Sequence, residues 1–231
     1  MKKYLIIFSA LILIVFLFYA GKSTDFEKNI DSEKSKKNYS LKIEQVKSTV
    51  DKDKDGIDDY TEILLNARNQ IGRVTKYNTS YYSSAYPPED SGACSDVIWR
   101  AFKNTGYDFK KMLDEDIKKN QKNYSNIKTP DPNIDFRRVR NIRTFLEKNT
   151  KKLTNSVKPW DEKNLKQWQG GDIVTYDQIP GRLWHIAIVS DKRRKDGVPL
   201  IIHNYGGGVK EDDYLLNWPA KITGHYRFDL N

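Results

Sequence analysis

The stretch Ser91-Gly-Ala-Cys-Ser-Asp-Val-Ile-Trp-Arg-Ala-Phe102 contains the only cysteine of the chain, Cys94. Behind this cysteine, apolar residues recur at helical spacing: Val97, Ile98, Ala101 and Phe102. The pattern predicts a short amphipathic helix that begins at or just before Cys94. Unpaired amide N–H groups and the positive end of the helix dipole meet at such a start, and both favour the thiolate, which attacks carbonyl groups. We therefore predict that Cys94 is a nucleophile, with a small apolar core residue as the alternative.

The length of the chain is that of one domain of ordinary size with additional segments. The chain has 231 residues, with 40 Lys and Arg against 31 Asp and Glu, and a formal net charge of +9. The basic residues are scattered, which fits an anionic surface such as a cell wall or a lipid layer. The sequence has no zinc finger, recognition helix or aromatic RNA-binding motif, so nucleic acid is not an expected partner. We expect a monomer.

Residues 1–21 resemble an export signal or a single membrane anchor. Met1-Lys-Lys is followed by an uncharged apolar run from Tyr4 to Ala20. Because Phe18 is bulky where signal cleavage requires a small residue, we predict an uncleaved anchor. The body of the protein is then extracytoplasmic, either anchored to the membrane or, if the segment is cleaved, secreted. Residues 22–45 are charged, offer little to bury, and are predicted to be a disordered linker. In an oxidising compartment a lone cysteine cannot form an internal disulfide, so Cys94 is a free thiol.

Residues 46–71 contain a predicted calcium loop and its exit helix. Asp51-Lys-Asp-Lys-Asp-Gly-Ile-Asp-Asp-Tyr-Thr-Glu62 matches the EF-hand pattern at each ligand position. The predicted ligands are Asp51, Asp53, Asp55, the carbonyl of Ile57, Asp59 directly or through water, and Glu62. A single loop indicates a structural Ca²⁺ clamp rather than a sensor, and no cofactor is expected for catalysis. The alternative is an acidic helix start that holds no ion.

Residues 72–231 are predicted to form one α+β domain in which helices precede an antiparallel sheet. A second amphipathic helix is expected where apolar residues again recur at helical spacing: Val139, Ile142, Phe145 and Leu146. Four arginines beside it are either a solvated face or a site for an anionic group: Arg137, Arg138, Arg140 and Arg143. Strands are expected at residues 173–177, 184–190, 198–204 and 222–228.

Two histidines in the predicted strands are candidates for the residues that activate Cys94. His185 opens one predicted strand and His203 ends the next, so antiparallel pairing would make them neighbours. We predict His185 as the general base and His203 as the residue that orients it. His225 is assigned to strand pairing or core hydrogen bonding, and a zinc site is a lesser alternative. The candidates for substrate binding are Tyr82, Tyr86, Asp96, Trp184 and Asn204.

Four motifs together resemble the NlpC-type superfamily of papain-like cell-wall cysteine peptidases: Cys94-Ser-Asp-Val97, Gly171-Asp-Ile-Val174, His185-Ile-Ala-Ile-Val189 and Ile201-Ile-His203. More specific runs resemble the bacterial family named domain of unknown function 1287: Tyr86-Pro87, Gly92-Ala-Cys-Ser-Asp-Val97, Pro130-Asp-Pro-Asn-Ile-Asp135, Arg137-Arg-Val139, His185-Ile-Ala-Ile-Val-Ser-Asp191, Ile202-His-Asn204 and Ile222-Thr-Gly-His-Tyr226.

The resemblance implies a papain-like fold and a triad of Cys94, His185 and His203 that cleaves peptidoglycan stem peptides. An acyltransferase or transpeptidase using the same triad is an alternative. So is a non-catalytic, calcium-stabilised protein of the surface or wall.

Overall fold

The computed structural model describes residues 40–178 and 184–229. The predicted anchor and nearly all of the predicted linker lie outside these ranges. Within the ranges, no helix combines the length and the apolar character that a membrane span requires. Residues from Leu41 onward form one compact unit.

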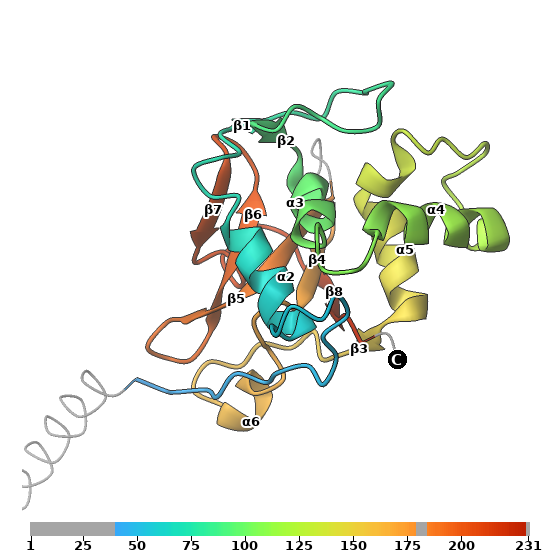
Figure 1. Ribbon diagram of the computed structural model, residues 1–231. Helices are drawn as coiled ribbons and strands as arrows, with labels where there is room; N and C mark the ends of the chain where they lie inside the picture. Colours follow the sequence, from blue (N-terminus) through green and yellow to red (C-terminus); the bar gives the residue numbers. More distant parts are fainter. Residues whose placement is uncertain (1–39, 179–183, 230–231) are drawn as a thin grey trace, which may run out of the picture. The chain divides into compact units, whose positions relative to one another are not determined.

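Helices come first along the chain, as the periodicity predicts (Figure 1). Three of them begin at an aspartate whose side chain accepts a backbone N–H of the first turn: Asp58, Asp108 and Asp161. The helices are α2 (Asp59–Arg68), α3 (Cys94–Ala101), α4 (Phe109–Asn120), α5 (Val139–Asn149) and α6 (Glu162–Leu165). Two 3₁₀ turns join them, η1 (Gln121–Asn123) and η2 (Asp135–Arg137). The predicted helices at Cys94 and at Val139 are confirmed.

A six-stranded antiparallel sheet follows, with strand order β3-β8-β4-β5-β6-β7. Its strands are β3 (Lys151–Lys152), β4 (Ile173–Tyr176), β5 (His185–Arg193), β6 (Pro199–Asn204), β7 (Val209–Asp212) and β8 (Ile222–Arg227). Two short strands, β1 (Lys76–Tyr77) and β2 (Ser91–Gly92), pair in parallel just before α3. The α+β class and the antiparallel sheet are therefore confirmed. No strand was expected at β7, because this edge strand lacks apolar alternation.

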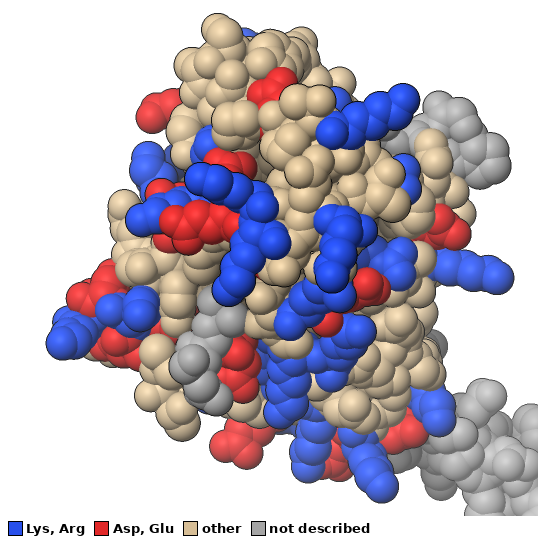
Figure 2. Space-filling view, turned by 90° about the vertical axis from the view of Figure 1, so that its right-hand side faces the viewer, with Lys and Arg blue, Asp and Glu red and all other residues tan. Residues whose placement is uncertain are grey.

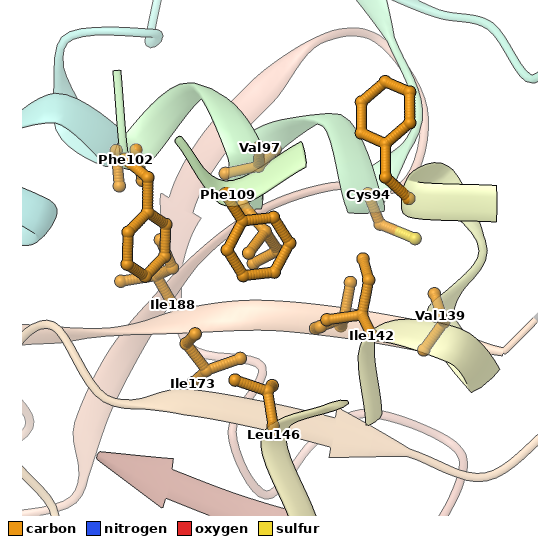
Figure 3. Packing of buried hydrophobic residues seen from close by; sticks show 14 of the residues in the cluster. Cys94, Val97, Phe102, Phe109, Val139, Ile142, Leu146, Ile173 and Ile188 are labelled. Atoms are coloured by element: carbon orange, nitrogen blue, oxygen red, sulfur yellow. The ribbon is translucent and has the colours of Figure 1, made fainter. Parts of the chain in front are cut away.

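The sheet separates two apolar clusters, and β5 shows why. Ile186 and Ile188 pack with α3 and α5, whereas Ala187 and Val189 pack in the second cluster. Successive strand side chains point to opposite faces, so one strand supplies both cores. Figure 3 shows the first cluster, in which residues of α3 and α5 meet Ile173 and Ile188 of the sheet. The start of α3 is thus held against the sheet by burial of its apolar face.

The compact unit begins before the predicted domain boundary at residue 72. Ile63 and Leu64 of α2 are buried in the first cluster, and Gln70 donates from its side-chain amide to the carbonyl of Val97 in α3. Leu41, at the end of the predicted linker, is buried and donates its N–H to Lys195 O. The segment that contains the acidic loop and α2 therefore packs as part of the same unit as the sheet. This packing requires contacts between distant parts of the chain, which composition does not reveal.

Asp172, directly before β4, is the centre of a buried ion network. Both carboxylate oxygens of Asp172 accept from the Arg227 guanidinium, at 2.7 and 2.8 Å. His225 Nε2 lies 2.9 Å from Asp172 Oδ2, and its ring stacks on Trp168 at 3.7 Å between centroids. His225 is therefore a core residue that ties β8 to β4, in agreement with the role assigned from sequence. The geometry gives it no contact with the Cys94 region.

Charge is spread over the surface. Figure 2 shows Lys and Arg side chains over one face, with Asp and Glu side chains among them. This distribution agrees with the scattered basic residues of the sequence.

Candidate functional site

Cys94 is the first residue of α3, and a buried carboxylate fixes its position. Asp96 accepts the N–H of Ala93 at 2.6 Å and the indole N–H of Trp99 at 2.8 Å. The Arg137 guanidinium donates to both Asp96 oxygens, at 2.7 and 2.9 Å. Because Asp96 is 0% exposed, it caps the helix and holds η2 against it. Asp96, which the sequence predicts to bind substrate, makes its contacts within the protein in this structure.

The sulfur of Cys94 lies against the backbone of β5. It is 3.8 Å from the carbonyl oxygen of Trp184, and the Ile186 N–H also hydrogen-bonds to it. These two residues flank His185, so the thiol contacts the strand on both sides of the predicted base. The side chain of Cys94 is buried, with only 3% of its surface exposed.

Burial, more than the helix start, sets the ionisation of this thiol. Desolvation, together with the charge of Asp96, raises the pKa of Cys94 to about 12. The N–H groups of Ile186, Ser95 and Cys94 act in the opposite direction and are outweighed. The helix start therefore favours the thiolate as expected, but burial outweighs this effect, and the group is a neutral thiol at pH 7.

The two predicted histidines meet, and a carboxylate extends their chain. His185 Nε2 is 2.7 Å from His203 Nδ1, and His203 Nε2 is 2.9 Å from Asp212 Oδ1. Desolvation lowers the pKa of His185 well below its usual value, with His203 contributing, and burial also lowers the pKa of His203. Both rings are therefore neutral near pH 7. Trp218 stacks on the His185 ring at 3.8 Å between centroids and covers it.

The hydrogen-bond chain assigns a tautomer to each ring. An ionised Asp212 only accepts, so His203 donates from Nε2 and accepts at Nδ1. His185 must then donate from Nε2, and its other nitrogen, Nδ1, carries the lone pair. The chain thus prepares His185 Nδ1 to accept a proton. The imidazolium formed would be stabilised through His203 by Asp212.

The thiol and the imidazole do not form a hydrogen bond in the described structure. Along β5, Ile186 and Ile188 face the helices and Cys94. The His185 ring lies on the other face of the strand, where it stacks on Trp218, a residue that packs against the second cluster. The structure therefore joins His185 to His203, as predicted from sequence, and places Cys94 beside the backbone of their strand. The predicted direct contact from thiol to imidazole is absent from the described residues.

Cys94 forms part of the wall of a pocket of about 660 Å³. Tyr77, Trp184 and Ile134 also line it, and three exposed basic side chains surround it: Lys128, Arg138 and Arg140. The Arg140 guanidinium lies 6.0 Å from the centre of the Trp184 ring. Of the four arginines noted in the sequence, Arg137, Arg138 and Arg140 line this pocket. Arg137 also pairs with Asp96, and Arg143 pairs with Glu147.

Of the predicted substrate-binding residues, only Trp184 lines the Cys94 pocket. Asn204 is buried and donates to the carbonyls of Gly92 and Lys76, so it holds β2 beside β6. Tyr86 packs on Trp99 with ring centroids 4.9 Å apart, in a separate surface pocket. Tyr82 lies beneath the Arg137 guanidinium, 5.1 Å from its ring centre. Tyr82, Tyr86 and Asn204 thus make their contacts within the protein.

Two parts of the site were not found from the sequence. Asp212 was missed because it lies in the charged edge strand β7, where no alternation marks a strand. Lys128 was missed because it lies in a loop, and only folding brings that loop to the pocket. Neither position has a local signal that separates it from other charged surface residues.

The acidic loop forms the cluster that its spacing predicts. One oxygen from each of Asp51, Asp53 and Asp55 lies within 4.8 Å of the others. Asp59 differs from the expectation, because its two oxygens accept from Lys52 N–H at 2.9 Å and from the Tyr107 hydroxyl at 2.7 Å. Burial, together with the carboxylates of Asp53, Asp55 and Asp59, raises the pKa of Glu62 to about 7.

The raised thiol pKa predicts slow alkylation of Cys94. Only the thiolate reacts, so the rate with iodoacetamide should climb about tenfold per pH unit between pH 6 and pH 9 without reaching a plateau. The rate should also be lower than that of an unstructured cysteine peptide at each pH. Because the chain has one cysteine, mass spectrometry of the intact protein reads this site alone. A plateau at or below pH 7 would contradict the prediction and indicate a thiolate–imidazolium pair.

Comparisons with known proteins agree with the sequence motifs. Residues 64–228 match the family described as domain of unknown function (DUF1287). A relative in Escherichia coli (strain K12), named uncharacterized protein YijF, is 40% identical over 173 residues, which cover 72% of this chain and 80% of the relative. No solved structure matches the chain. Since the family match covers most of the chain and includes Cys94, His185, His203 and Asp212, the protein belongs to the DUF1287 family.

Proposed function

We propose that the protein is a papain-like, NlpC-type cysteine amidase or peptidase that cleaves peptide bonds of the cell wall. Cys94 is the nucleophile, His185 the base, and His203 and Asp212 position and stabilise the base. The observation that carries the proposal is the hydrogen-bonded chain from Asp212 through His203 to His185, which ends on the strand segment that the Cys94 sulfur contacts. A buried pair of neutral histidines ending in a carboxylate resembles the support that nucleophile–base pairs require.

The mechanism starts from neutral partners. His185 Nδ1 takes the Cys94 proton as the sulfur bonds to the substrate carbonyl carbon, and then protonates the leaving amine as the C–N bond breaks. Water next attacks the thioester, which releases the acid and returns the proton to sulfur. The N–H groups at the start of α3 are placed to stabilise the oxyanion. In the described structure the His185 ring lies on the face of β5 opposite Cys94, so the mechanism requires substrate binding to bring the imidazole and the sulfur to the same side of the strand.

The surroundings of Cys94 favour an anionic substrate. Lys128, Arg138 and Arg140 border the pocket with exposed side chains, and Arg140 lies over the Trp184 ring. Asp131 and Asp135 also line it, but their carboxylates accept hydrogen bonds from neighbouring groups of the protein. Peptidoglycan stem peptides carry free carboxylates that such side chains bind. The N-terminal apolar segment supports a location outside the cytoplasm, anchored to the membrane, where this substrate occurs.

A direct assay tests the proposal. The purified protein is incubated with defined muropeptides at pH 7–9, and the products are identified by mass spectrometry. We expect two fragments whose masses add up to the substrate plus one water. If an added amine appears in the acyl fragment, the same triad catalyses transfer. Intact muropeptides after long incubation at high enzyme concentration would refute the proposed hydrolysis.

The second candidate is a wall-binding protein with an unreactive cysteine. The raised pKa of the Cys94 thiol and the missing contact between thiol and imidazole favour it. This candidate predicts that the protein sediments with purified cell walls and releases no fragment from them. The same incubation therefore separates the two functions.

A further inference from the structure

We propose that residues 51–62 form a Ca²⁺ site in which Asp51, Asp53, Asp55 and Glu62 supply carboxylate oxygens and Ile57 supplies its carbonyl. The ion holds the loop before α2 together, and this loop packs against the connection between α3 and α4. The site is independent of the hydrolase chemistry. Family membership does not imply it either, because the matched region begins at residue 64, after the loop.

The first observation is a group of carboxylates gathered without counter-charges. One oxygen from each of Asp51, Asp53 and Asp55 lies within 4.8 Å of the others. Among the described residues, no ion pair with Lys or Arg involves any of the three or Glu62. Backbone N–H groups of the loop hold these carboxylates in place, as those of Lys54 and Gly56 hold Asp51, and Ca²⁺ prefers such clustered oxygen ligands.

The second, independent observation is the buried carboxylate of Glu62. Its side chain lies in the first turn of α2, only 8% of Glu62 is exposed, and its Oε2 has no hydrogen-bond partner. Helix side chains lean toward the N-terminus of their helix, which directs this carboxylate back to the acidic loop. A buried carboxylate oxygen without a partner is unfavourable. A cation bound between Glu62 and the three aspartates would give this oxygen the partner that it lacks.

The loop is closed and attached to the body of the protein without the ion. The Asp59 N–H donates to Val50 O at 3.0 Å, which holds the two ends of the loop together. Asp59 also accepts the Tyr107 hydroxyl at 2.7 Å, and a Cβ at Gly106 would come within 2.7 Å of Lys52 Cγ. Because the cage is preformed against the turn before α4, little ordering is required when the ion binds. Asp59 therefore positions the loop, and Glu62 closes the coordination shell.

Calcium titration of the full-length protein tests the site. The chelator-treated protein, purified in mild detergent, is titrated with CaCl₂ in a calorimeter, and its thermal unfolding is followed with and without Ca²⁺. We expect one ion per chain with a Kd of about 10⁻⁴ M and a Tm higher by about 5 °C at saturation. Neither readout depends on hydrolysis, so a failure of the proposed function leaves this test valid.

Three variants decide whether the ion binds at this loop. Glu62→Gln keeps the shape of the buried side chain, and Asp53→Asn changes an exposed one, so the second variant remains informative if the first folds poorly. Both should weaken Ca²⁺ binding by at least about tenfold. The matched control Glu115→Gln, an exposed carboxylate of α4, should bind Ca²⁺ like the wild type. Absence of heat and of a Tm shift up to about 10 mM Ca²⁺ would overturn the proposal. Wild-type affinity in both loop variants would also overturn it, because the ion would then bind elsewhere.

Discussion

The Cys94→Ala variant is expected to release no fragment from muropeptides, a loss of at least about 10³-fold in kcat. The replacement removes the sulfur that forms the thioester, and water cannot replace it in a pocket arranged around this side chain. The fold should be retained, because alanine is smaller, apolar, and favourable at a helix start that Asp96 caps. Release of products is measured by mass spectrometry, and the fold by circular dichroism and Tm.

The histidines provide the matched comparison for this prediction. His185→Ala should lower kcat by about 10²–10⁴-fold, because the proton acceptor is lost. His225→Gln changes a histidine of the same sheet that bonds to Asp172, away from the pocket, so it should lower Tm and leave kcat within about threefold. If Cys94→Ala cleaved muropeptides as fast as the wild type, the nucleophile would be a different residue and the proposed mechanism would be rejected.

The Asp96→Ala variant is expected to lower the free energy of unfolding by about 3–5 kcal/mol. Asp96 is fully buried, and its loss leaves the buried guanidinium of Arg137 without a counter-charge. The variant also leaves the N–H groups of Ala93 and Trp99 without their acceptor at the start of α3. The free energy is measured by urea denaturation, with the m-value compared to confirm an unchanged unfolding transition.

A surface carboxylate calibrates the Asp96 result. Glu115→Ala removes an exposed partner of Lys111, 4.0 Å away, and should change stability by less than about 0.5 kcal/mol. A double variant of Asp96→Ala with Arg137→Met should recover part of the loss, because no unpaired charge is then buried. A cost below about 1 kcal/mol for Asp96→Ala alone would mean that water reaches Arg137, contrary to the buried network.

The effects expected for Cys94→Ala and Asp96→Ala both arise at the start of α3. Asp96 holds the start of α3 against η2, and Cys94 at that start touches β5 next to His185. We therefore expect partial loss of Asp96 contacts, as in Asp96→Asn, to lower activity as well as stability. The effect on activity arises through the position of the sulfur, since Asp96 itself does not face the pocket.

Several features of this protein follow from local sequence. The helix at Cys94 is specified by apolar residues three and four apart, and the sheet by short apolar runs with polar breaks. The meeting of His185 and His203 was also predictable, because antiparallel neighbours bring the start of one strand to the end of the next. Each of these inferences needs only spacing along the chain, which the sequence gives directly.

Other features were decided only by tertiary structure, because they depend on what surrounds a side chain. A helix start suggests a reactive thiol, yet packing against the β5 backbone desolvates Cys94 and raises its pKa. Asp96 has the sequence position of a ligand-binding carboxylate, and folding buries it against Arg137. Asp212 joins the histidines only because the edge strand β7 pairs with β6. Spacing along the chain specifies which residues share a face, whereas burial and long-range pairing determine which of them are charged, exposed and in contact.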